Sequence, residues 1–391
     1  MVESFPYGKA PFWTTLLAAI SLVLVLATRT WGKGERPELV MHTFAKNHME
    51  SYRAMLPAFE REHGVKVAVE LVQVRALEQR LQNSLLAGTP TPDLVELRGG
   101  VMGFFTRGRV EDVGFMDMTE RLERDGLRKR LVESRLSLWS TRGHVFGLPH
   151  DVHPVMLMYR ADLVESLGID VKELETWDDF VRVGKTVVKD FDGDGVPDRY
   201  MLDFPAAAAW GVNLLLLQQG ISVFDEAGNV NFDREETVDT ILWYLRQMFG
   251  PERIAYDCGA NIVGGAVFNK ALNDGLALFY VAPDWRTHSV RMEVPGVAGK
   301  MKLMPLPAWK RGGRRTSVWG GSGLAIAKNT KHPELAWKLA KFLYFDKSQL
   351  GPRFKHTNIL PALKDAWGAP EFSEPQPFFS NQPVGALFAE L

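Results

Sequence analysis

A turn, a strand and a helix follow one another within residues 143–170, and this stretch constrains the fold more than any other. It contains a Gly-Leu-Pro turn at 147–149, an apolar run at 155–159 and a short helical segment at 161–167. This order in mid-chain is typical of a crossover between two α/β lobes. The side chains that we expect to face the gap between the lobes are those of His150, Asp151 and Tyr159.

Alternating strand and helix patterns predict an α/β lobe over residues 37–149. The expected order is strand, helix, strand, helix and strand, over residues 38–44, 52–59, 65–71, 77–85 and 93–97. This order predicts a parallel sheet with right-handed crossovers, in which ligands bind beyond the carboxyl ends of the strands. Phe44 and Arg98 lie at such ends and are candidates for a cleft, although core packing explains Phe44 equally well.

Similar patterns continue over residues 202–351, where we expect a second lobe. Asp233 is placed to cap a helix. The apolar face expected for that helix consists of Val238, Ile241, Leu242, Leu245 and Phe249. Further along, a strand at 276–281 leads into a Pro-Asp-Trp sequence.

An acidic loop follows a capped helix at residues 190–198. Its carboxylates occupy positions 1, 3, 5 and 9 with Gly at position 6, as in the start of an EF-hand loop. Met201 stands at position 12, where a bidentate Glu is expected. The loop is therefore either a metal-free acidic loop or a structural Ca²⁺ site. The candidate ligands of that site are Asp190, Asp192, Asp194, Val196 and Asp198.

An apolar run near the N-terminus, residues 12–27, falls just short of the length that spans a bilayer comfortably. Val25 and Ala27 suit a signal-peptide cleavage site, whereas the basic residues that follow them favour a retained anchor. Residues 1–36 are thus expected to be a signal peptide or a membrane anchor with a short linker, and a buried core helix is the alternative. Both leading interpretations place the folded part outside the cytoplasm.

Composition excludes several classes of function. The 391 residues are too many for one ordinary core, and a net charge of −1 gives no electrostatic footprint for nucleic acid. The single cysteine, Cys258, cannot form an internal disulfide. No metalloprotease, nucleophile-elbow or phosphate-loop motif occurs, and the sequence around Ser322 lacks the glycine of a hydrolase turn. A zinc site at His150 and His153 is disfavoured because a strand would direct them to opposite faces.

Three motifs carry a family resemblance. The first motif is the Gly-Leu-Pro-x-Asp turn with its following strand. It is followed along the chain by the Asp-Gly-Asp-Gly loop and then by the Val-Trp-Gly-Gly strand near 318–326. Residues 37–350 resemble extracellular solute-binding proteins of ABC importers, in the carbohydrate-binding branch. The resemblance implies a periplasmic-binding-protein-like α/β fold, type II-like, with two lobes joined by hinge strands.

The resemblance also implies how the chain is divided. Residues 37–149 would form lobe 1, with a return of the chain to it after about 350. Residues 150–351 would form the hinge and lobe 2, and residues 352–391 a C-terminal segment. Family members usually continue with further helix, so this segment could be truncated.

Aromatic and polar side chains near the strand ends are the expected ligand contacts. Sugar rings stack their C–H faces on indoles, while their hydroxyls bind planar polar groups. The candidate ligand-binding residues are Phe44, Arg98, His150, Asp151, Tyr159, Trp210, Trp285, Trp319 and Gly320. Core packing of each Trp, and a structural salt link between His150 and Asp151, are the alternatives.

By this resemblance the protein is a periplasmic or other extracytoplasmic substrate-binding component of an ABC transporter, anchored to the membrane if the N-terminal segment is uncleaved. It would capture a small carbohydrate by hinge closure and pass it to the permease subunits. We expect it to act as a monomer and to catalyse no reaction. The only cofactor expected is the structural Ca²⁺ considered above. One alternative is the same fold binding a polyamine, a phosphorylated polyol or a metal chelate. The other is a secreted hydrolase that uses His150 and Asp151.

Overall fold

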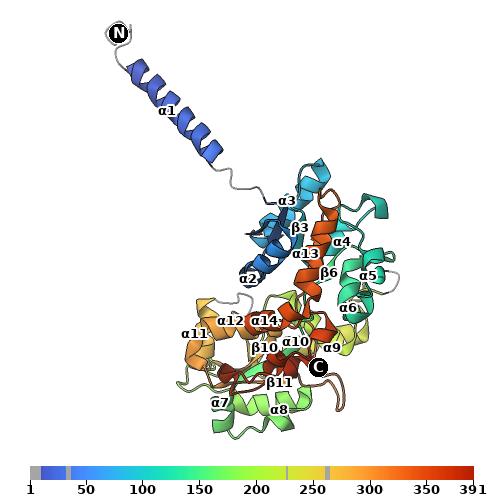
Figure 1. The fold of residues 1–391 in the computed structure, drawn as a ribbon. Helices are drawn as coiled ribbons and strands as arrows, with labels where there is room; N and C mark the ends of the chain where they lie inside the picture. The colour runs from blue at the N-terminus through green and yellow to red at the C-terminus, as the bar shows by residue number, and fades with distance from the viewer. Residues whose placement is uncertain (1–9, 32–36, 226–227, 260–264) are drawn as a thin grey trace.

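The computed structural model describes residues 10–31, 37–225, 228–259 and 265–391. Two sheets, each with helices packed on it, form two lobes, as the predicted fold class requires (Figure 1). Helix α1 (Ala10–Trp31) projects away from both lobes. Within the described ranges, none of the helices has the length and apolar character needed to cross a bilayer. The predicted signal or anchor lies partly outside the described residues, at 1–9 and 32–36.

The first sheet confirms the strand–helix alternation predicted near the N-terminus. Its strand order is β2 (Val67–Leu71), β1 (Leu39–Thr43), β3 (Leu94–Arg98), β12 (Ser322–Ile326) and β6 (Leu148–Pro149). Strand β1 runs parallel to β2 and β3, whereas β12 runs antiparallel to β3 and β6. The helices of this lobe are α2 (Lys46–His63), α3 (Val74–Ala87), α4 (Gly99–Phe105), α5 (Thr119–Arg124), α6 (Glu133–Leu136) and α13 (Pro333–Phe345). A small antiparallel hairpin of β4 (Ser140–Thr141) and β5 (His144–Val145) lies between α6 and β6 in the chain.

The second sheet is mixed. Its order is β11 (Met301–Pro305), β7 (Val155–Arg160), β10 (Ala277–Pro283), β8 (Tyr200–Asp203) and β9 (Ala255–Tyr256). Strand β7 is antiparallel to both β10 and β11, and every one of its residues is buried. The helices are α7 (Ala161–Ser166), α8 (Trp177–Val187), α9 (Ala209–Gln219), α10 (Glu235–Met248), α11 (Ala266–Asp274) and α12 (Asp284–Glu293). A capping box formed by Thr176 and Asp179 begins α8.

The predicted lobe boundaries are wrong in two places. Strand β12 lies in the first sheet, so the chain returns to lobe 1 near Ser322 and not after residue 350. The C-terminal helices α14 (Lys347–Thr357), α15 (Pro370–Ser373) and α16 (Val384–Ala389) follow α13, and phenylalanines in this segment join the core of the second lobe. Strand β12 is buried along its whole length, and a fully buried strand has no polar face that would indicate which of two sheets it joins.

The predicted packing face of α10 is also wrong. The stripe from Val238 to Phe249 faces solvent, and the helix begins after Arg234 instead of being capped by Asp233. The side chains that α10 buries are Thr237, Thr240, Tyr244, Gln247 and Met248. Helical periodicity identifies an apolar stripe, but it does not say whether that stripe packs on the core of the lobe or faces away from it.

Candidate ligand-binding cleft

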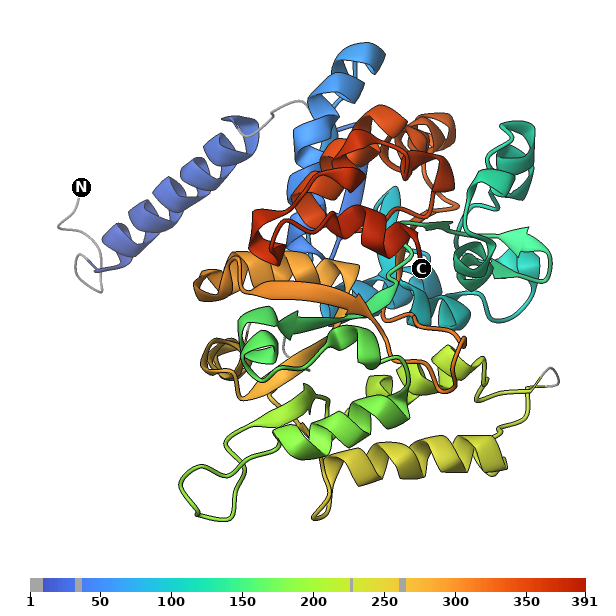
Figure 2. The same ribbon diagram turned by 90° about the horizontal axis from the view of Figure 1, so that it is seen from below.

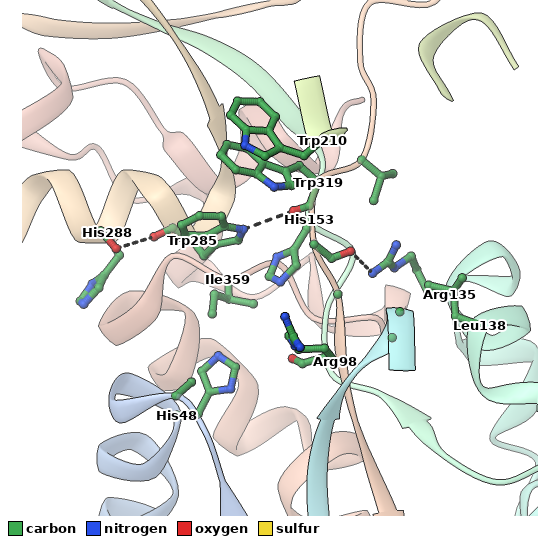
Figure 3. Close-up of a pocket in the computed structure, with 18 of the residues that line it drawn as sticks. His48, Arg98, Arg135, Leu138, His153, Trp210, Trp285, His288, Trp319 and Ile359 are labelled. Atoms are coloured by element: carbon green, nitrogen blue, oxygen red, sulfur yellow. Dashed lines mark hydrogen bonds between the residues drawn. The ribbon is translucent and has the colours of Figure 1, made fainter. Parts of the chain in front are cut away.

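A cavity of about 1540 Å³ lies between the two lobes and is walled by both of them. The wall formed by the first lobe includes Phe44, Lys46, His48 and Arg98. The second lobe contributes Trp210, Trp285, His288 and Arg314. The segments that cross between the lobes contribute His153, Trp319 and Gly320, and Figure 3 shows His153 and Trp319 beside the other indoles. A cavity of this size exceeds the usual range of roughly 300–1,000 Å³ for small-molecule pockets, so it can hold a ligand of several rings.

Three indoles form the second-lobe wall of the cavity (Figure 3). Trp319 stacks on Trp210 with ring centroids 3.7 Å apart and an interplanar angle of 12°. Trp285 meets Trp319 edge-on at 5.3 Å, and its indole N–H donates to the Trp319 carbonyl at 3.3 Å. The buried guanidinium of Arg286 lies 5.5 Å from the Trp319 ring. All three indoles are only partly buried, and each lines the cavity.

A buried ion cluster joins the crossing segments beneath these indoles. His153 lies between the carboxylates of Asp151, 3.0 Å from Nε2, and Asp284, 2.6 Å from Nδ1. Burial disfavours the imidazolium, but the two carboxylates outweigh this effect and raise the pKa of His153 to about 9. The second oxygen of Asp284 accepts the backbone N–H of Leu360 at 2.7 Å. Asp151 accepts the hydroxyl of Ser322 at 2.6 Å. Residues from three crossing segments are thus held by one cluster.

Two glycines let the chain pass this cluster closely. Gly320 and Gly321 have φ of 103° and 139°, a region that side chains disfavour. A Cβ atom on Gly321 would collide with the guanidinium of Arg135. With glycine there, Arg135 donates to the Gly320 carbonyl at 3.1 Å and lies 3.3 Å from Asp151. Gly320 itself lines the cavity, as expected for backbone that approaches a ligand.

On the first-lobe wall, Phe44 and Arg98 lie at the cavity, at the ends of their strands. Arg98 makes a bidentate pair with Glu78, with both distances 2.8 Å. Its fork is therefore already occupied, and a ligand would meet a positioned and largely neutralised guanidinium.

Three predicted cleft residues do not line the cavity, which corrects the interpretation of the hinge stretch. Tyr159 packs on Phe279 in the core of the second lobe, because β7 lies between two strands and has no solvent-facing side. Asp151 and His150 are buried behind the cavity wall. His150 lies 3.3 Å from Asp151, so the alternative of a structural link describes them better.

His153, His48 and Lys46 are cavity-wall residues that sequence reasoning missed as ligand contacts. A signal existed for His153, since it stands two residues after Asp151 in the crossing segment. Its partner Asp284 lies 131 positions away in the sequence, and no local pattern connects the two residues.

A polar network underlies the first-lobe wall. Glu96 is buried and accepts hydrogen bonds from the hydroxyls of Tyr52, Tyr344 and Thr43, and Nδ1 of His48 lies 3.1 Å from it. His150 stacks on His48 at 4.2 Å, and burial lowers the pKa of His150 to about 3.

His48, Glu96 and His150 are close enough together to hold a metal ion. However, their imidazole planes are only 24° apart, so the ring nitrogens point side by side instead of converging. Glu96 also has its acceptor positions filled. This arrangement fits a hydrogen-bonded core better than a metal centre.

The acidic loop lies on the second lobe, and none of its residues lines the cavity. Asp190 accepts the backbone N–H groups of Gly193 and Gly195 at 2.6 and 2.9 Å, which lowers its pKa. The carboxylates of Asp190, Asp192 and Asp194 are grouped closely enough for one cation. Because exposed acidic turns commonly adopt such geometry without metal, Ca²⁺ binding here stays a prediction.

Comparisons with known proteins agree with this geometry. The sequence pattern that defines the family of bacterial extracellular solute-binding proteins matches residues 45–350. Two arabinooligosaccharide-binding proteins are similar in sequence. The one from Halalkalibacterium halodurans is 27% identical over 88% of this chain and 75% of its own length. The one from Bacillus subtilis is 27% identical over 92% and 81%. A lactose-binding protein of Rhizobium radiobacter is 25% identical over 80% and 72%.

Solved structures show the same fold. The sugar-binding protein MalE from Xanthomonas citri superposes with a TM-score of 0.73 at 19% identity, covering 90% of this chain and 85% of its own. A binding protein from B. animalis subsp. lactis, solved with β-1,6-galactobiose, gives a TM-score of 0.68 at 18% identity over 90% and 84%. Together with the family match over most of the chain, these likenesses lead to one conclusion: the protein belongs to the bacterial extracellular solute-binding proteins.

Proposed function

We propose that this protein binds a neutral oligosaccharide between its lobes and delivers it to the membrane subunits of an ABC importer. The observation that carries the proposal is the wall of three partly exposed indoles, Trp210, Trp285 and Trp319, in a cavity of about 1540 Å³. Indole faces complement the apolar faces of sugar rings, and the volume suits more than one ring. The relatives bind arabino-oligosaccharides, lactose and galacto-oligosaccharides, as their names state.

The charges of the cleft favour a neutral ligand over the alternatives. Among the described residues that line the cavity, the carboxylates are Glu50 and Glu293, too few to surround a polyamine. Arg98 is paired with Glu78, Arg135 with Asp151 and Lys46 with Glu50, so these cations are already paired before a phosphate could reach them. Arg314 donates to the Leu217 carbonyl, and one guanidinium is fewer than the cluster expected of a phosphate site. Hydroxyl groups, by contrast, can share these oriented donors without bringing a charge into the cleft.

Binding would operate by hinge closure. A ligand that touches both walls stabilises the closed arrangement by its additional contacts there. The crossing segments held by the His153 cluster are the positions where backbone rotation could change the angle between the lobes. No chemical step is needed, and the relatives are binding proteins.

Calorimetric titration tests the proposal. Arabino-oligosaccharides and galacto-oligosaccharides of two to five sugar units, arabinose, spermidine and glycerol phosphate would each be titrated into the full chain. We expect saturable binding of an oligosaccharide, with monosaccharides weaker because they reach fewer of the indoles. Binding of spermidine or glycerol phosphate alone would refute the carbohydrate assignment while leaving the fold intact.

The family is extracellular, which places the two lobes outside the cytoplasm. We propose that α1 belongs to the segment that exports the lobes, as a signal peptide or as a retained anchor. Fractionation of cells followed by N-terminal sequencing distinguishes the two. Recovery of the intact chain in the cytoplasm would contradict both.

A further inference from the structure

The outer face of α10 carries an apolar stripe that the lobe leaves uncovered. Its members, which we call the α10 stripe, are Val238, Leu242, Leu245 and Phe249, and their side chains are 38%, 41%, 41% and 51% exposed. A spacing of four and three residues keeps Val238, Leu242 and Leu245 on one side of the helix, and Phe249 follows directly after its last residue. Four large apolar side chains aligned in this way go beyond the scattered exposed residues that are normal on a surface.

The exposed apolar surface extends past the start of the helix. Phe232 is 54% exposed just before α10, and Val230 is 55% exposed in the bridged segment that precedes it. In Figure 2, α10 (yellow) forms the outer edge of the second lobe. None of its residues lines the ligand cavity. The surface is therefore separate from the site of the proposed function.

Charged residues beside the α10 stripe indicate what can cover it. Asp239 and Arg246 are both exposed and stand seven residues apart, so they share one flank of the stripe. Neither forms an ion pair with any other residue in the described parts of the chain. The first turn of α10 carries Glu235 and Glu236, and its last turn carries Arg246.

Two copies of α10 packed antiparallel would match these charges. A two-fold axis perpendicular to both helices places a given flank against the same flank of the second copy. Asp239 of each copy then faces Arg246 of the other, so the attraction occurs twice. Parallel packing about a two-fold axis along the helices would place the two copies of this flank on opposite sides of the interface, so Asp239 of one copy would not face Arg246 of the other. The stripe is also self-complementary, since Val238 meets Phe249, and Leu242 meets Leu245.

We propose that the α10 stripe is a homodimer interface, in which α10 packs antiparallel on α10 of a second copy across a two-fold axis. The interface lies away from the cavity walls, so both clefts stay accessible. This inference does not depend on the ligand. It differs from the monomer expected from the sequence resemblance.

Sedimentation velocity on the full chain, at about 1 to about 100 µM, tests the association. We expect a monomer–dimer equilibrium that Leu242→Asp shifts to monomer, because the substitution places a carboxylate at the centre of an apolar contact. Leu86→Asp is the matched control, since Leu86 is 80% exposed on α3 of the other lobe. Circular dichroism and the thermal midpoint verify that each variant is folded. A monomer at every concentration would overturn the proposal, as would a Leu242→Asp dimer, which would assign the association to α1 or another surface.

Charge reversal tests the antiparallel arrangement. Asp239→Arg and Arg246→Asp should each raise the dimer dissociation constant by about tenfold, because each replaces two attractions by two repulsions. The double variant D239R/R246D restores opposite charges and should return the dissociation constant to near that of the native chain. If the double variant is weaker than either single variant, the antiparallel pairing is wrong.

Discussion

Nδ1 of His153 and Oδ1 of Asp284 lie 2.6 Å apart beneath the ligand cavity, although 131 residues separate them in the sequence. The contact joins the segment that leaves β6 to the first residue of α12, and Asp151 binds the other ring nitrogen. A doubly paired imidazolium at this position makes the hinge sensitive to the protonation of one side chain.

Stability should therefore fall on the alkaline side of neutrality. The carboxylates, working against burial, raise the pKa of His153 to about 9, against about 6.5 in an unfolded chain. The folded state holds the proton more tightly, so this contribution is complete below pH 6.5 and is lost as the pH rises through 9. We expect a loss of about 3 kcal/mol in the free energy of unfolding, measured by urea denaturation. His153→Gln should be less stable at pH 6.5 and should show a flatter profile between pH 6.5 and 9. A wild-type profile that is level across this range would contradict the assignment.

On the acid side of neutrality, His150 contributes to the loss of stability. Burial first, and then the charges of His48 and Arg353, lower its pKa to about 3, so the unfolded chain binds a proton that the folded chain excludes. Because the unfolded state holds more protons between pH 6.5 and 3, stability falls as the pH decreases through this range. His150→Gln should reduce the slope between pH 6.5 and about 4.5, above the range where most carboxylates titrate. His332→Gln, exposed just before α13 and outside these contacts, is the control and should leave the slope unchanged.

Local sequence patterns were sufficient for the first sheet and for part of the site. The apolar spacing in α2 and the strand–helix alternation predicted β1, β2 and β3 in their parallel arrangement. Trp285 and Arg98 reach the cavity because they follow or end strands whose carboxyl ends meet there. These features depend on periodicity and on a general rule for α/β sheets, so a single sequence contains them.

What the sequence could not predict depends on tertiary context. Tyr159 was expected in the cleft, but strands on both sides of β7 bury it, and neighbouring strands are not visible in a local pattern. The sheet to which β12 belongs and the exposed face of α10 are undetermined for the same reason. The role of His153 requires knowing that Asp284 is adjacent, which only the folded chain establishes.

Truncation of the indoles should separate sugar stacking from structural packing. Trp319→Ala removes the ring that contacts both Trp210 and Trp285, and it should raise the dissociation constant of the oligosaccharide at least about tenfold. It should also abolish the exciton couplet expected in the circular dichroism of two indoles stacked 3.7 Å apart. Trp13→Ala, on the exposed face of α1, is the control. Unchanged affinity in a folded Trp319→Ala variant would remove this indole from the binding site.

Substitution of Gly321 should disturb the hinge cluster through a single added carbon. Its φ of 139° disfavours a side chain, and a Cβ would also overlap the guanidinium of Arg135, which binds both Asp151 and the Gly320 carbonyl. We expect Gly321→Ala to cost about 3 kcal/mol or more in urea denaturation, from backbone strain and from displacement of Arg135. Gly312→Ala is the matched control, because Gly312 also has positive φ, 71°, but open space around its Cβ position. Its cost should stay near the 1–2 kcal/mol of backbone strain alone. Equal losses in the two variants would show that Arg135 moves aside freely, and that its contacts with the hinge do not constrain the backbone at Gly321.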